Sequence, residues 1–143
     1  MNNTAMEIHL LNVQVPFSRE VSRFVSRKSR QDYHRDESEK VMAPIRQMFD
    51  NFSIPYSVHV ELGDRAKIIT GTARRLRCGQ IVMSTARKNS LTRLVEDSVT
   101  NKVLALTSVP VEVIVGDTVS IWERYGIPVG IGAVIALMFA AAD

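Results

Sequence analysis

The chain has 143 residues, of which 45% are hydrophobic and 23% are charged, and its formal net charge is +3. This length and composition predict one globular domain with a buried core, and so small a charge argues against a dedicated nucleic-acid binder. The single cysteine, Cys78, excludes an intramolecular disulfide. Residues 1–5 do not resemble a signal peptide. We therefore expect a cytoplasmic protein.

The first elements expected along the chain are a strand, a basic segment and a helix. Residues 7–15 contain an apolar run that predicts a strand. Residues 18–30 are a basic segment with one short helical face, and they contain five basic residues and a single acidic one. Residues 32–52 carry apolar side chains at helical spacing, which predicts a helix. Pro44 lies inside this helix and should kink it or remove one hydrogen bond.

A second strand and a third helix are expected next. Residues 54–62 alternate around Val58 and Val60, which predicts a half-buried strand. Asp64 is placed to cap the following helix, and Gly79 is placed to end it. The residues of this helix that we expect to face the core are Ala66, Ile69, Ala73 and Leu76.

Residues 80–116 predict a strand, a helix and another strand. The run from Ile81 to Met83 is apolar but too short for a helix. Val109–Val115 is rich in β-branched residues and predicts the last strand. Units of this kind almost always cross over right-handed into a parallel sheet. The buried face of the intervening helix is expected at Val95, Val99, Val103 and Leu106.

This stretch resembles the universal stress protein family. That family has a strand ending in Met-Gly, then Gly-x2-Gly-x9-Gly-Ser/Thr, a helix, and a last strand of the Val-Pro-Val type. The positions that match are Met83, Ser98, Val99, Lys102, Val103 and Val109-Pro110-Val111. The three glycine positions do not match, because they hold Ser84, Arg87 and Asp97.

The resemblance implies a three-layer α/β sandwich with a mostly parallel sheet, of the kind also found in adenine-nucleotide alpha-hydrolases. It covers residues 7–116 and lacks the family's first strand and helix. We therefore expect an α/β domain over residues 1–116, incomplete at its N-terminus, and a linker with a hydrophobic helix over residues 117–143.

The family's first strand lies in the middle of a five-stranded sheet, and its loop supplies an aspartate to the nucleotide pocket. Three explanations for its absence stay open. The gene start lies upstream of Met1, which is the explanation we favour; the strand at residues 7–15 pairs directly with the strand at residue 80; or another chain inserts a strand.

By the same resemblance, a nucleotide site would involve Val13, Met83, Ser84, Arg87, Asp97, Ser98 and Val99. Glycines in such a loop let backbone amides approach phosphate closely, and here side chains take their place. Val13 and Met83 are explained better as core residues. We expect no tight ATP binding, with an ATP- or AMP-binding switch that uses Ser84, Arg87 and Ser98 as the alternative.

Nothing in the sequence indicates catalysis. The three histidines, His9, His34 and His59, have no metal-ligand spacing, and no Ser-His-Asp or Cys-His arrangement is evident. Cys78 is placed like a buried structural residue. The resemblance then implies a non-enzymatic regulatory protein of the stress response.

Two groups of basic residues, within residues 19–35 and 74–88, are interpreted as solvated surface. Either group could also face anions or acidic headgroups, but we do not expect nucleic acid as a partner, since no aromatic residues are interleaved with them. In the family the last strand commonly pairs with its own copy. We therefore expect a homodimer through Val109–Val115.

The C-terminal segment Tyr125–Ala142 contains no charged residue. Its 18 residues are at the lower limit for a membrane-spanning helix, with Trp122 and Tyr125 as an interface-like flank. Two interpretations stay open: a membrane anchor, or a hydrophobic helix packed on a partner or on the incomplete sheet. On the membrane interpretation, deleting this segment should make the protein more soluble.

Overall fold

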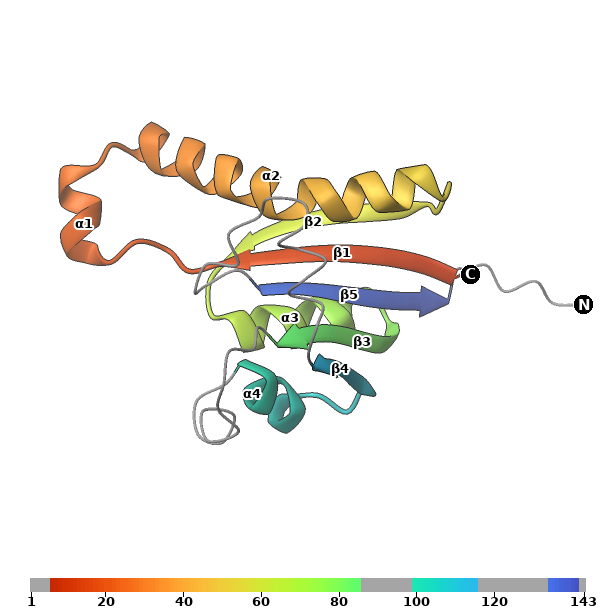
Figure 1. Cartoon of the computed structure of the whole chain (residues 1–143). Coiled ribbons are helices and arrows are strands. Elements are labelled where there is room, and N and C mark those ends of the chain that lie inside the picture. The colour runs from red at the N-terminus through yellow and green to blue at the C-terminus, as the bar shows by residue number, and fades with distance from the viewer. Residues whose placement is uncertain (1–5, 86–98, 116–133, 142–143) are drawn as a thin grey trace, which may run out of the picture.

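The structure is a computed structural model that describes residues 6–85, 99–115 and 134–141. Strands and helices alternate along most of the chain, as Figure 1 shows. In chain order the elements are β1 (Met6–Gln14), α1 (Arg19–Phe24), α2 (Arg27–Asn51), β2 (Tyr56–Leu62), α3 (Arg65–Arg75), β3 (Cys78–Thr85), α4 (Val99–Leu106), β4 (Val111–Val115) and β5 (Val134–Ala141).

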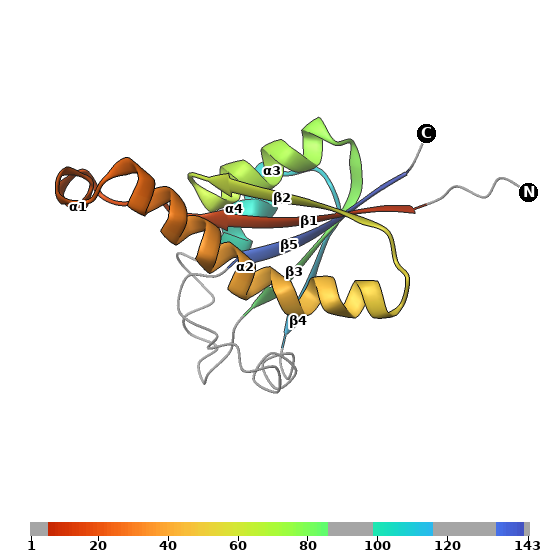
Figure 2. The ribbon, with the colours of Figure 1, turned by 90° about the horizontal axis from the view of Figure 1, so that it is seen from above.

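The strands form one five-stranded sheet with the order β2-β1-β5-β3-β4. The ladders β1–β2 and β3–β4 are parallel, as expected for strand–helix–strand units. Helix α2 covers one face, and α3 and α4 cover the other (Figure 2). The predicted three-layer fold with a mostly parallel sheet is therefore confirmed.

Strand β5 occupies the middle of this sheet and runs antiparallel to both neighbours. Its residues pair with β1 from Met6↔Ala141 to Val13↔Val134, and with β3 from Cys78↔Ala140 to Met83↔Ala136. One of our explanations was that the strand at residues 7–15 pairs directly with the strand at residue 80. That explanation is wrong, because β5 lies between the two strands. A C-terminal segment of the same chain fills the central position instead.

The predicted C-terminal helix is wrong for residues 134–141, which form β5. An uninterrupted apolar run suits a buried strand as well as a buried helix, because neither leaves a polar face in the sequence. Two open strand edges decide the outcome, since each buried backbone group left unpaired costs about 1–3 kcal/mol. Residues 116–133 and 142–143 lie outside the described residues.

The two faces of the sheet bury two separate hydrophobic clusters. On the α2 face, Leu10 packs with three apolar side chains spaced along one side of that helix. On the opposite face, Leu11 and Val13 pack with α3, β3 and α4. The α2 residues are Met42, Ile45 and Phe49. The α3 residues include Ala66, Ile69 and Ala73, which were predicted to face the core.

The ends of α2 and α3 agree only in part with the sequence predictions. Asp64 caps α3 as predicted, because its Oδ1 accepts a hydrogen bond of 3.0 Å from the Lys67 amide. Pro44 lies inside α2, which nevertheless continues from Arg27 to Asn51. Gly79 does not end α3: Arg77 takes the left-handed conformation there, with φ of 53°, and Gly79 already belongs to β3.

Strand β2 alternates in burial, but in the opposite phase to our expectation. Val58, Val60 and Leu62 are exposed, whereas the residues between them are half-buried. The reason is that β2 is an edge strand. Its Val58 face lies on the α2 side, where α2 covers the sheet at Phe49 and Tyr56 but leaves the later part of the strand open.

Candidate functional site

The residues that the resemblance assigns to a nucleotide site lie near the carboxyl ends of β1 and β3, where parallel α/β sheets bind ligands. Val13 and Met83 are both buried, in the same cluster, and Val99 at the start of α4 packs against it. Ser84 pairs with Ile114 in the β3–β4 ladder. The remaining predicted residues, Arg87, Asp97 and Ser98, lie outside the described part of the chain.

At this edge β5 separates the two strands that would frame the pocket. Val13 pairs with Val134, the first residue of β5, while Leu11 and Met83 both pair with Ala136. Because β5 is antiparallel, the chain enters the sheet here. A parallel strand in this position would leave the sheet at this edge and continue into a loop, which is where the resemblance places an aspartate.

A polar network that the sequence analysis did not identify lies on the α2 side of the same edge. Asn12 is fully buried, and its Oδ1 accepts a hydrogen bond of 3.1 Å from Gln14 Nε2. Gln14 Nε2 also donates to the backbone oxygen of His34 at 2.8 Å, and His34 Nδ1 donates to Gln14 Oε1 at 2.6 Å. The sequence held a signal for this network, because the two amide side chains of Asn12 and Gln14 follow the apolar pair Leu10-Leu11 at the end of β1.

A hollow of about 500 Å³ adjoins this network between α2 and β2. Its walls combine polar side chains of the helix with the exposed apolar face of the edge strand. The lining residues are Gln31, His34, Arg35, Ser38, Glu39, Val60, Glu61 and Leu62. This composition offers hydrogen-bonding and charged groups but no arrangement of a nucleophile with a base.

The structure brings together two histidines that are 50 residues apart in the sequence. His9 Nδ1 and His59 Nε2 are separated by 3.1 Å, and His9 Nε2 lies 3.6 Å from Glu7 Oε1. Burial, followed by the neighbouring His9 and Arg75, lowers the pKa of His59 below its ordinary value. Among the described residues, no three His, Cys, Asp or Glu side chains form a group that could hold a metal ion.

Cys78 is buried at the start of β3, as predicted for a structural residue. Burial, and secondarily the charge of Glu7, raise the pKa of its thiol. A raised pKa leaves little thiolate at neutral pH, which makes the side chain a poor nucleophile.

Comparison with known proteins identifies the family of the chain. A model of the universal stress protein family matches residues 2–114, most of the sequence. The chain belongs to the universal stress protein family.

One solved structure similar to this universal stress protein is that of hypothetical protein MJ0577, reported as a structure-based assignment of its biochemical function. The two chains are 19% identical, with a TM-score of 0.56 over 78% of this chain and 76% of the other. At this identity the likeness shows the fold alone. Comparison with curated proteins finds no match.

The family match ends at residue 114, whereas β5 begins at Val134. In this universal stress protein, the middle of the sheet is thus completed by a strand from outside the matched region. None of the helices that the structure describes is both long enough and apolar enough to cross a membrane.

Proposed function

We propose that this universal stress protein is a non-enzymatic regulatory protein of the cytoplasmic stress response, which acts through contacts with other proteins and does not bind ATP tightly. Family membership supports the role in stress response. The more specific parts of the proposal depend on the candidate nucleotide site.

The burial of Val13 and Met83 carries the proposal. Val13 is 0% exposed and Met83 is 3% exposed, so their side chains contact the core and leave almost no surface for an adenine ring. The glycines that would let backbone amides approach phosphate are replaced by Ser84, Arg87 and Asp97. Asp97 also adds a negative charge where phosphate oxygens would lie by resemblance.

The first prediction is that ATP binds no more tightly than about 100 μM, which corresponds to about −5.5 kcal/mol. Isothermal titration calorimetry with ATP and Mg²⁺ on the full chain measures this directly. A dissociation constant in the low micromolar range would overturn the proposal and favour the alternative, a switch in which Ser84, Arg87 and Ser98 hold ATP or AMP.

A matched variant separates the two reasons for weak binding. The triple substitution Ser84→Gly, Arg87→Gly and Asp97→Gly restores the glycines without changing β5. If this variant binds ATP tightly, the glycines alone account for the weak binding of the natural chain. If it binds as weakly as the natural chain, the antiparallel strand β5 in the middle of the sheet is responsible.

We further propose that the protein is a homodimer through the strand predicted at Val109–Val115, which corresponds to β4. This proposal is supported by the position of β4 at an edge of the sheet, where backbone groups are free to pair. We do not propose a membrane anchor through Tyr125–Ala142, because residues 134–141 are paired to strands on both sides.

A further inference from the structure

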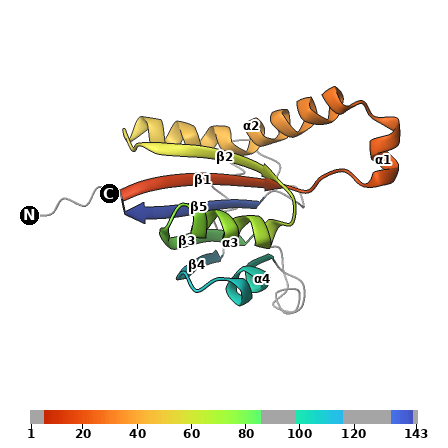
Figure 3. The same ribbon diagram turned by 180° about the vertical axis from the view of Figure 1, so that it is seen from behind.

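Residues 18–30, which we call the basic arm, project from the body of the molecule. The basic arm comprises α1 and the first turn of α2. Figures 1 and 3 show α1 and the start of α2 extending beyond the end of the sheet, and Figure 2 shows the same projection at right angles. No residue of α1 is buried.

The basic arm holds the molecule's excess of positive charge. It contains five basic residues and one acidic residue, a net charge of +4, whereas the whole chain has +3. The remainder of the chain is therefore slightly negative, at −1. The basic residues are Arg19, Arg23, Arg27, Lys28 and Arg30.

These five side chains form no ion pair with any acid in the part of the chain that the structure describes. The next basic residues along α2 behave differently. Arg35 contacts Asp32 at 3.1 Å, and Lys40 contacts Glu37 at 2.8 Å. The change from unpaired to paired cations coincides with the place where α2 leaves the arm and runs along the sheet.

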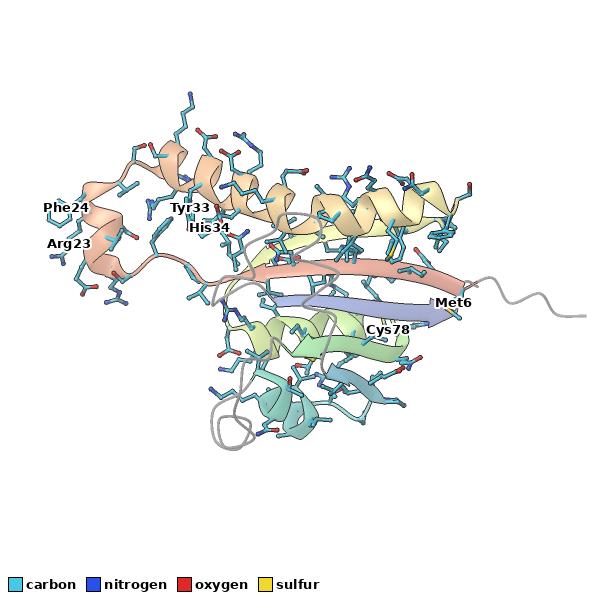
Figure 4. The ribbon with its side chains drawn as sticks, viewed as in Figure 1. Met6, Arg23, Phe24, Tyr33, His34 and Cys78 are labelled. Atoms are coloured by element: carbon cyan, nitrogen blue, oxygen red, sulfur yellow. The ribbon has the colours of Figure 1, made fainter. Side chains whose placement is uncertain are left out.

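The tip of the basic arm is apolar as well as cationic. Phe24 is 88% exposed and Val21, three residues earlier in the same short helix, is 43% exposed. Figure 4 shows Arg23 and Phe24 pointing outward from the end of the arm, away from the sheet. A phenyl ring held in water beside several cations suits a surface with an anionic layer above an apolar one.

The base of the arm is held in place. The Phe17 ring lies 5.2 Å from the Tyr33 ring and 5.0 Å from the His34 ring, measured between centroids. His34 in turn is fixed to β1 through its two hydrogen bonds with Gln14. Ser18 and Ser26 cap α1 and α2 through their side-chain oxygens. The direction of the arm is therefore set before any partner arrives.

We propose that the basic arm docks this protein on an anionic lipid bilayer, with its cations at the headgroups and Phe24 inserted among the acyl chains. Anionic membrane surfaces attract clusters of Lys and Arg, and the attraction decays within a Debye length. A projecting arm brings its tip to a flat surface without contact by the slightly negative body. A single-stranded nucleic acid fits less well, since it would use several interleaved aromatic rings, and the exposed tip has one.

Vesicle sedimentation of the full chain tests this proposal. The natural protein should bind vesicles in which about a third of the phosphatidylcholine is replaced by phosphatidylglycerol, should not bind pure phosphatidylcholine, and should dissociate as salt is raised. The double substitution Arg23→Glu with Lys28→Glu should weaken binding about tenfold or more. Phe24→Ser should also weaken binding to the anionic vesicles, without changing the charge.

The matched control is Lys67→Glu with Arg74→Glu, two exposed positions on α3. Both double variants change the net charge of the chain from +3 to −1, so only the place of the charge differs. The control should bind within about twofold of the natural protein if the arm is the docking surface. Circular dichroism verifies that all variants fold.

Three results would overturn the proposal. The first is absence of binding by the natural protein to anionic vesicles. The second is an equal loss in both double variants, which would show attraction by net charge alone. The third is binding to a single-stranded oligonucleotide but not to vesicles, lost in the Arg23→Glu, Lys28→Glu variant, which would assign the arm to nucleic acid. Unchanged binding by Phe24→Ser would refute the insertion of the ring.

Discussion

His9 and His59 form a hydrogen bond that constrains the protons of both rings. One facing nitrogen must carry a proton and the other must not. If neutral His9 carries its proton on Nε2, that proton faces Glu7, and its Nδ1 can accept from His59 Nε2–H. This assignment satisfies the three side chains together, and it follows from the network. A second proton on His59 would add a cation in a partly buried place beside Arg75.

Burial, followed by the charges of His9 and Arg75, lowers the pKa of His59, and the charges of Glu61 and Glu7 oppose this shift. The lowered pKa makes the free energy of unfolding depend on pH. Above about pH 6.5 the side chain is neutral in both folded and unfolded protein, so its contribution is fully present. As the pH falls below that value, the unfolded chain takes up a proton first. The free energy of unfolding should therefore decrease toward the lowered pKa, by at most about 1.4 kcal/mol per pH unit for one proton.

Urea denaturation at a series of pH values from about 7.5 to 5 measures this dependence. The variant His59→Gln should show a shallower decrease than the natural protein. An identical slope in the natural protein and in His59→Gln would refute the assignment to this side chain.

At the scale of elements, β5 determines whether the sheet is continuous. It is the only connection between the β1–β2 pair and the β3–β4 pair within the described sheet. Both of its edges are paired, so any loss of its backbone geometry exposes hydrogen-bonding groups on β1 and β3 together. The helices on the two faces lose their support at the same time.

Leu137→Pro should destabilise the protein strongly. Leu137 pairs with both Leu10 and Val82, and proline removes its N–H and leaves a buried acceptor unpaired, at a cost of about 1–3 kcal/mol before steric strain is counted. Thermal unfolding by circular dichroism measures the loss. Val113→Pro in the edge strand β4 is the matched control and should cost much less.

Deletion of residues 125–143 extends this prediction. We now expect aggregation or loss of cooperative unfolding, the reverse of the gain in solubility expected from a membrane anchor. A synthetic peptide of residues 134–141, added to the truncated chain during refolding, should restore part of the soluble fraction. A truncated protein that stays soluble and unfolds cooperatively would show that β5 is dispensable.

At the scale of the whole molecule, β4 leaves one edge of the sheet open to a second copy. The Ile81 amide donates to the Pro110 oxygen at 2.9 Å, which fixes which residues of β4 face β3. Because backbone groups of alternate residues point to opposite sides of a strand, those of Val111 and Val113 face the open edge. These outward groups are the ones a second β4 would bind.

Val113→Pro should therefore convert a dimer to a monomer with little loss of fold, because it removes an outward donor and no bond to β3. Sedimentation equilibrium on the natural protein and the variant measures the association. Val60→Lys, which alters the opposite edge at β2, should leave the dimer intact. A dimer that survives Val113→Pro but not Val60→Lys would move the interface to β2.

The sequence by itself determined the order and type of the elements from residue 7 to residue 115, with the exception of details at their ends. These depend on local periodicity, on caps such as Asp64, and on the handedness of strand–helix–strand units, all of which are set by neighbouring residues. The sequence did not predict that Val58, Val60 and Leu62 would be the exposed residues of β2. The reason is that burial of this edge strand depends on how far α2 extends over it.

Only the tertiary structure decided the fate of the C-terminal segment and the contacts between distant residues. Residues 134–141 carry no polar face that distinguishes a strand from a helix, and their conformation is set by the open edges of β1 and β3, which are more than 50 residues away. The His9–His59 and Gln14–His34 contacts likewise depend on strand register and helix placement. A local sequence pattern holds no information about which strands pair across a sheet. For this reason the position of β5 between β1 and β3 could be found only from the tertiary structure.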